Sequence, residues 1–319
     1  MQAGSKPLRS DVFFKREKSS AMPAKLSCTI LLPDAYRREE ILAFHRRDPE
    51  AGAERVTECA LQKGLVWAGR PACLEVRFGE GQVEAELAMD GSVAGNARQL
   101  EALVRRMLGL TQPVEEFEAR YREHPHLGGL INRHAGLRVA VAATPFEALS
   151  WAIIGQQISV SAAVSMRRKL IRAVGLRHKD LFCYPGAAEV AELSSAALRK
   201  AGLSTAKAET LLRVAEQTAA GAMPLEDWAG ACPVDEIRQR LLAVRGIGPW
   251  TVNYTLLRGY AWLDGSLHGD VAVRRGLQRL LGRTEKVGAE EAEAWLAQFS
   301  PWRALVAAHL WALKSRMAY

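Results

Sequence analysis

The sequence has few cysteines, and none of them is spaced for a shared metal site. Cys28, Cys59, Cys73, Cys183 and Cys232 are scattered through 319 residues without a C-x-x-C pair. This spacing argues against a zinc knuckle and against a disulfide framework. We therefore expect five free thiols.

Long apolar runs are also missing. No stretch approaches the roughly 20 consecutive apolar residues that a membrane-spanning helix needs, and no apolar block stands beside a small-residue cleavage site near the N-terminus. Low-complexity segments and exact repeats are absent from the sequence as well. We expect a cytoplasmic globular protein with no membrane contact, associated with the nucleoid if it binds DNA.

Acidic residues are outnumbered. The chain has 43 Lys and Arg against 35 Asp and Glu, a net charge of +8. Residues 1–27 contribute six basic and two acidic side chains to this excess. Such a balance favours a polyanionic partner, although weakly.

What is present divides into three parts. Residues 1–27 lack periodicity and are predicted to form a basic disordered arm. Residues 28–92 resemble a small α+β domain, because "LSCTILL" is β-like, "REEILAFHRRD" is helical and "CLEVRFGEGQVEAELAM" alternates on both sides of residues 79–82 as a hairpin does. Residues 93–319 are predicted to be helical, with no strand beyond residue 95. The clearest helices are expected at 145–174, 195–201, 205–220, 234–244, 250–260, 271–281 and 289–314.

The segment "RGIGPWTVNYTLL" predicts a sharp reversal between two helices. Gly246 and Gly248 permit a tight turn, and Pro249 suits the first position of the following helix. Backbone N–H groups at such a helix start can contact a phosphate, helped by the helix dipole. The same residues also fit an ordinary helical hairpin, so both interpretations remain open at this point.

A solitary acid follows the second helix. Asp270 stands before an amphipathic helix, in a stretch that contains Arg274, Arg275, Arg279 and Arg283. Aspartate in this position is a favoured N-cap, and a cap can also be a catalytic carboxylate, because backbone N–H groups hold it ionised and in place.

Together these segments resemble the helix-hairpin-helix DNA glycosylase superfamily. "GIGPWTVNYTLL" followed by "LDGSLHGDVAVRRGL" is similar to its hairpin and loop aspartate, and "WAIIGQQISVSAA", "PWRALVAAHLW" and "AFHRRDPEAGAERV" are similar to segments of the bacterial 3-methyladenine DNA glycosylase II type. The resemblance covers roughly residues 28–315. It implies an α+β N-terminal domain followed by a mainly helical glycosylase fold.

The resemblance also implies a site and a reaction. Asp270 would be catalytic, stabilising positive charge on deoxyribose as an alkylated purine is hydrolysed from double-stranded DNA. The flipped base would enter a pocket where cation–π contacts favour a positively charged base. The pocket residues implied are Trp250, Tyr254, Trp302, Gln156 and Val160; the DNA-binding residues are Gly246, Ile247, Gly248, Thr251 and Gln157.

The resemblance also leads to expectations about lyase activity, cofactors and the wedge residue. Trp250 stands where bifunctional relatives have an attacking lysine, so we expect no lyase activity, and an iron–sulfur loop cannot follow Cys232, the last cysteine. No cofactor is expected beyond a monovalent cation on the carbonyls of Leu242, Val244 and Ile247. The wedge that fills the gap left by the flipped base would be Gln157, where the best-known member of this branch has a leucine.

The pocket also departs from the family pattern, because Val271 replaces an aromatic residue and Gly269 an acid. Trp262, Trp295 and Trp311 are assigned to the core. A monomer acting on DNA is expected. The alternatives are a non-catalytic module that recognises lesions, with Asp270 as a cap only, and a glycosylase/lyase for oxidised bases.

Overall fold

A computed structural model describes residues 24–92 and 94–313 of the chain. The N-terminal part contains an antiparallel sheet with strand order β1-β5-β4-β3-β2. Its strands are β1 (Ala24–Leu31), β2 (Glu54–Val56), β3 (Ala60–Trp67), β4 (Arg70–Phe78) and β5 (Gln82–Met89). The predicted hairpin is confirmed: β4 pairs with β5 up to Phe78 opposite Val83, and Gly81 turns the chain with a φ of +67°.

The predicted arm extended too far into the chain. Residues 24–27 belong to β1, which pairs with β5 from Ala24 opposite Met89 onwards. The composition of residues 24–27 could not show that they form a strand, since an edge strand becomes ordered through hydrogen bonds to the neighbouring strand. Residues 1–23, the rest of the predicted arm, lie outside the described residues.

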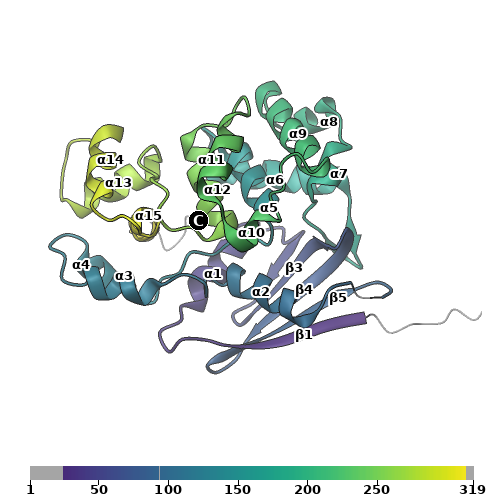
Figure 1. Cartoon of the computed structure of the whole chain (residues 1–319), viewed down its shortest axis with the longest axis horizontal. Coiled ribbons are helices and arrows are strands. Elements are labelled where there is room, and N and C mark those ends of the chain that lie inside the picture. The colour runs from purple at the N-terminus through teal and green to yellow at the C-terminus, as the bar shows by residue number, and fades with distance from the viewer. Residues whose placement is uncertain (1–23, 93, 314–319) are drawn as a thin grey trace, which may run out of the picture.

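Two helices accompany the sheet, α1 (Arg38–His45) and α2 (Ala97–Met107). Asn96 and Gln99 form a capping box at the start of α2. This helix lies across the sheet (Figure 1), and its residues Leu100, Val104 and Met107 share the sheet's apolar core. Sequence analysis had grouped this helix with the helical region that follows.

The rest of the described chain is mainly helical, as predicted. A second apolar core lies among these helices, with α5 against α12, α6 and α9. Every residue of α5 except Gly155 is buried, so this helix is the centre of the bundle. The helices are α3 (Val114–Tyr121), α4 (Gly128–Arg133), α5 (Pro145–Gly155), α6 (Val160–Val174), α7 (Ala187–Ala191), α8 (Ser195–Lys200), α9 (Thr205–Ala219), α10 (Trp228–Ala231), α11 (Val234–Leu242), α12 (Pro249–Tyr260), α13 (Val271–Leu280), α14 (Ala289–Ala297) and α15 (Arg303–Ala312).

Two sequence predictions for this region were wrong. The helix predicted over 145–174 is two helices, because the chain breaks after Gly155 and Ser159 caps α6 by accepting a hydrogen bond from the Ala162 N–H. Strands also occur beyond residue 95: β6 (Arg177–His178) pairs with β7 (Leu181–Phe182). Strands of two residues are too short to show an alternating pattern.

A buried ionic cluster joins the sheet to the helical region. The ammonium of Lys63 on β3 donates hydrogen bonds to Glu54 on β2 and Glu147 on α5, each at 2.7 Å. Arg167 on α6 also lies 3.0 Å from Glu147. Burial by itself would raise the pKa of Glu54, but Arg167 and Lys63 hold it well below the usual value. The two parts of the chain are therefore connected by charges as well as by apolar packing.

All five cysteines are free thiols. Within the described ranges, every helix is too short or too polar to cross a bilayer.

Candidate active site and nucleic-acid interface

The helix-hairpin-helix predicted from the glycines is formed by α11 and α12. Gly246 has a φ of +96°, and Gly248 is the N-cap of α12 with Pro249 in the first turn. The N-terminus of α12 has no side-chain cap. Its first N–H groups therefore lack both helical and side-chain acceptors, as an anion-binding terminus requires.

The two glycines have different surroundings in this turn. A Cβ on Gly246 would lie 2.2 Å from Oγ1 of Thr210, a residue on α9 that also donates a hydrogen bond to the Arg245 carbonyl. A Cβ on Gly248 would have no neighbour within 4 Å. Gly246 thus makes the reversal possible, whereas Gly248 leaves open space at the start of α12.

At this hairpin, backbone N–H groups are available for the expected phosphate contact, whereas the nearby side chains are not. Ile247 is buried, and so is Thr251. Gln156 turns toward this hairpin, donating hydrogen bonds from Nε2 to the Gly246 carbonyl at 3.0 Å and to Oγ1 of Thr251 at 2.9 Å. Gln156 therefore braces the hairpin and does not line the pocket described below.

Asp270 is the N-cap of α13. Its Oδ1 accepts hydrogen bonds from the N–H groups of Ala272 at 2.7 Å and Val273 at 3.1 Å. The indole N–H of Trp250 donates to Oδ2 at 3.1 Å, and that of Trp311 points to Oδ1 at 3.4 Å. The cap and the pocket carboxylate are the same group, so the two interpretations of this residue are compatible.

A cavity of about 170 Å³ opens beside this carboxylate. Trp250 and Tyr254 of α12 face it with ring centroids 5.2 Å apart, and Trp311 of α15 lies 6.4 Å from Tyr254. Val160, at the start of α6, is exposed and also lines the cavity. Of the predicted pocket residues, the structure brings together Trp250, Tyr254, Val160 and Asp270.

Trp302 does not take its expected place in the pocket, whereas Trp311 lines it. Trp302 packs in the core, against Phe117 and Tyr121 with ring centroids 6.2 and 6.0 Å away, and does not line the cavity. Trp302 precedes α15 as its N-cap, whereas Trp311 lies in the last turn of that helix, so the two side chains start from different ends of the element. Trp311 is buried in the helical core, as expected, and in addition lines the cavity and faces Asp270. Trp262 and Trp295 pack against the helical core as expected.

Gln157 stands in the break between α5 and α6. It is exposed and has a φ of +55°, and Lys207 fixes the break by donating to the carbonyls of Ile154 and Gln156. A non-glycine residue with positive φ is uncommon and often marks a functional position. The wedge role of Gln157 stays a prediction.

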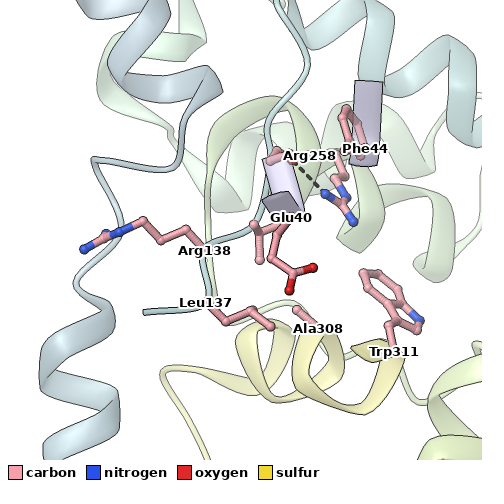
Figure 2. Close-up of a pocket in the computed structure, with 9 residues that line it drawn as sticks. Glu40, Phe44, Leu137, Arg138, Arg258, Ala308 and Trp311 are labelled. Carbon is pink, nitrogen blue, oxygen red and sulfur yellow. Dashed lines mark hydrogen bonds between the residues drawn. The ribbon is translucent and has the colours of Figure 1, made fainter. Parts of the chain in front are cut away.

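Sequence reasoning missed one wall of the cavity, the one that the N-terminal domain supplies. Phe44 at the end of α1 and Arg47 just beyond it line the cavity with Trp151 and Arg258 from the helical region. Figure 2 shows Phe44, Arg258 and Trp311 around a smaller adjoining hollow, where Arg258 donates to the Ala140 carbonyl at 2.8 Å. The only early signal for this wall was the helical segment "REEILAFHRRD".

The two residues that depart from the family pattern lie outside the cavity. Val271 is half exposed and Gly269 exposed, and neither lines the cavity. In the part of the chain that the structure describes, no group of three or more His, Cys, Asp or Glu side chains could hold a metal ion. The Val244 carbonyl accepts a hydrogen bond from the Ile247 N–H at 3.0 Å; a cation on this carbonyl and those of Leu242 and Ile247 stays a prediction.

The site thus combines an uncapped helix start after a glycine turn, an aromatic cavity and one fixed carboxylate, and comparisons with known proteins find the same kind of helical domain elsewhere. Residues 150–301 match the model of the HhH-GPD superfamily base excision DNA repair protein, and residues 33–144 match the AlkA N-terminal domain. The chain therefore combines, in this order, an AlkA N-terminal domain and a helical HhH-GPD domain.

Particular relatives support this assignment. The chain is 30% identical over 188 residues to DNA-3-methyladenine glycosylase 2 of Escherichia coli, covering 58% of this chain and 63% of that protein. The matched part thus spans less than two thirds of that relative, as it does for a similar Bacillus subtilis protein. The 3-methyladenine DNA glycosylase of Archaeoglobus fulgidus has the same fold, with a TM-score of 0.76, 23% identity and coverage of 89% and 97% of the two chains. Schizosaccharomyces pombe Mag1, solved in complex with abasic DNA, has a TM-score of 0.55 and 22% identity over 61% and 95%.

Proposed function

We propose that this protein is a monofunctional DNA glycosylase that removes alkylated purines from double-stranded DNA by hydrolysing the N-glycosidic bond. The observation that carries the proposal is the position of Asp270, fixed by two backbone N–H groups and one indole N–H at the mouth of an aromatic cavity. The names of its relatives, DNA-3-methyladenine glycosylases, support the substrate class.

The residues have distinct roles in this reaction. The base must leave the helical stack to reach the cavity, and the rings of Trp250, Tyr254 and Trp311 offer it π-faces. A positively charged alkylated base would gain about 0.5–2 kcal/mol from such faces. As the bond to the base breaks, positive charge develops on the sugar, and the Asp270 carboxylate stabilises it and orients water.

The hairpin positions the DNA. The uncapped start of α12 and the open space at Gly248 suit a duplex phosphate, which orients the protein without reading sequence. Gln157 would fill the space left by the flipped base. A monovalent cation on the Leu242, Val244 and Ile247 carbonyls is the single non-protein component that we propose.

The decisive experiment compares wild type with Asp270→Asn on duplexes that each carry one alkylated purine. Asparagine is as good an N-cap as aspartate, so this change removes the charge and leaves the helix start intact. We expect at least about 100-fold slower excision with DNA affinity within a few-fold of wild type. Excision at the wild-type rate would show that Asp270 is only a cap.

A second measurement separates hydrolysis from lyase chemistry. Trp250 occupies the position of the attacking amine, and its indole N–H donates a hydrogen bond to Asp270. Borohydride added during turnover should therefore trap no covalent protein–DNA adduct, and strands should break only after alkali. A trapped adduct would favour the glycosylase/lyase alternative, while lesion binding without any excision would favour the non-catalytic module.

A further inference from the structure

The break between α5 and α6 lies directly against the hairpin turn, although ninety positions of sequence separate Gln156 from Gly246. The side-chain amide of Gln156 donates from Nε2 to the Gly246 carbonyl at 3.0 Å and to Oγ1 of Thr251 at 2.9 Å. Gly246 makes the reversal, and Thr251 lies in the first turn of α12. One side chain from the break thus connects both ends of the turn where we expect a DNA phosphate.

Helix α9 holds the same two segments from another side. The ammonium of Lys207 donates to the carbonyls of Ile154 at 2.8 Å and Gln156 at 2.7 Å. These carbonyls lie at the C-terminal end of α5, where backbone acceptors lack helical partners and a cation is favourable. One turn along α9, Oγ1 of Thr210 lies 3.0 Å from the Arg245 carbonyl at the hairpin turn. The break and the turn are therefore fixed to one helix as well as to each other.

Gln157 is the residue whose position these contacts determine. It is exposed, and its φ of +55° is one that a non-glycine residue keeps only where the surrounding structure imposes it. Lys207 binds the carbonyl just before it, and the side chain of Gln156 is bound to the hairpin. The side chain of Gln157 therefore starts from a fixed point relative to the hairpin before any DNA is bound.

We propose that Lys207 and Gln156 are positioning residues that set the distance between the phosphate-binding turn and Gln157, so that the phosphate contact and the filling of the gap left by the flipped base occur in one binding step. A loop that became ordered only on DNA would lose backbone entropy at each residue of the break. A loop held in place beforehand loses none, so the phosphate contact helps to keep the base out of the stack. The inference rests on the proposed function and adds to it two residues outside the cavity.

The test measures whether Lys207 acts through Gln157. Lys207→Met keeps the length of the side chain and removes its donors, whereas Lys207→Arg keeps the charge and can still donate to two carbonyls. Gln156→Met removes the bonds to the turn and leaves Lys207 in place. Each change is made in the wild-type chain and in Gln157→Ala. Lys169→Met, at an exposed lysine of α6, is the matched control for the loss of one positive charge.

Two damaged duplexes separate positioning from bond breaking. The first carries a single 7-methylguanine, whose release is followed under single-turnover conditions. The second carries an abasic analogue opposite 2-aminopurine, whose fluorescence changes when a side chain enters the gap, so this duplex needs no excision. Affinity for undamaged duplex at two salt concentrations reports whether Lys207 itself contacts a phosphate, and thermal melting reports whether each variant is folded.

We expect Lys207→Met to slow release by about 10-fold to 100-fold, the scale of misplacing a group by about 1 Å. It should also reduce the fluorescence change, while affinity and salt slope on undamaged duplex stay at the wild-type values. Lys207→Arg should restore the rate to within about three-fold of wild type. In the Gln157→Ala chain, Lys207→Met or Gln156→Met should have less than about a two-fold further effect, because residues that act as a unit are not additive. Lys169→Met should match wild type.

The inference fails if Lys207 and Gln157 act independently. Losses that multiply in the double variants would show that Lys207 and Gln156 support the fold and not the wedge. A salt slope lowered by about 0.9 would make Lys207 a phosphate contact instead. Wild-type behaviour of Lys207→Met or of Gln157→Ala would also overturn the inference. A wild type that releases no 7-methylguanine would refute the proposed function, while the abasic duplex would still decide whether Lys207 positions Gln157.

Discussion

The different surroundings of Gly246 and Gly248 allow the phosphate contact to be tested without damaging the fold. Gly248→Ala places a methyl group where nothing lies within 4 Å, at a φ of −110° that alanine adopts freely. Alanine is a poorer N-cap than glycine but restricts the unfolded chain more, and each effect is below about 1 kcal/mol with opposite sign. The melting temperature should therefore change little.

Binding should change more. If the α12 N–H groups contact a phosphate at close range, the methyl group stands between them, and we expect about ten-fold weaker binding to damaged and undamaged duplex alike. The slope of log K against log salt should fall by about 0.9, the value for one phosphate. The ratio of the two affinities should stay constant, because phosphate contacts carry no information about the base.

Gly288→Ala is the matched control. Gly288 is the N-cap of α14, also without a side-chain cap and with no atom within 4 Å of an added Cβ. Its replacement should affect stability as Gly248→Ala does and leave DNA binding unchanged.

Gly246→Ala should behave differently from both. Its φ of +96° and the added Cβ only 2.2 Å from Oγ1 of Thr210 should destabilise the fold by at least about 2 kcal/mol, partly relieved by Thr210→Ala. Fluorescence anisotropy at two salt concentrations, combined with thermal melting, measures all four variants. Wild-type affinity and salt slope for a folded Gly248→Ala protein would remove the hairpin from the DNA interface.

Two further predictions concern buried charges. Lys63→Met leaves Glu54 and Glu147 facing each other with less compensation and should lower the free energy of unfolding by about 3 kcal/mol or more, measured by urea denaturation; a loss below 1 kcal/mol would mean that the cluster is not a structural link. Burial lowers the pKa of His309 to about 3, and neither ring nitrogen has a hydrogen-bond partner within the described chain. Because the unfolded chain takes up a proton below about pH 6.5 and the folded one does not, stability should be constant above that pH and fall by about 1.4 kcal/mol per unit below it. His309→Leu should flatten this part of the profile, and an unchanged profile would contradict the assignment.

Local features of the sequence predicted the fold class and half of the site. The hairpin glycines, the N-cap Asp270 and the face formed by Trp250 and Tyr254 all depend on residues close together in the chain. The break before α6 was also visible in principle, because Ser159 is a favoured N-cap residue, but the apolar pattern on either side concealed it.

The rest depended on contacts between distant segments. Phe44 and Arg47 reach the cavity only because the N-terminal domain packs against α5 and α12, and the helical pattern of their own segment does not indicate that contact. Trp302 stands just before α15 and Trp311 near its end, and which of the two reaches the cavity depends on how that helix is placed in the bundle. A pattern along one helix gives the relative directions of its side chains but not which direction is the core.

The position of α1 at the rim of the cavity has a consequence for how such proteins diversify. The carboxylate and the phosphate-binding hairpin belong to one stretch of sequence, while Phe44 and Arg47 belong to another, about two hundred positions earlier. Under the proposed function, mutations in the early stretch would alter which lesions are removed while the bond-breaking residues are inherited unchanged. Lineages exposed to different chemical damage would then adapt by varying a few codons of that one stretch.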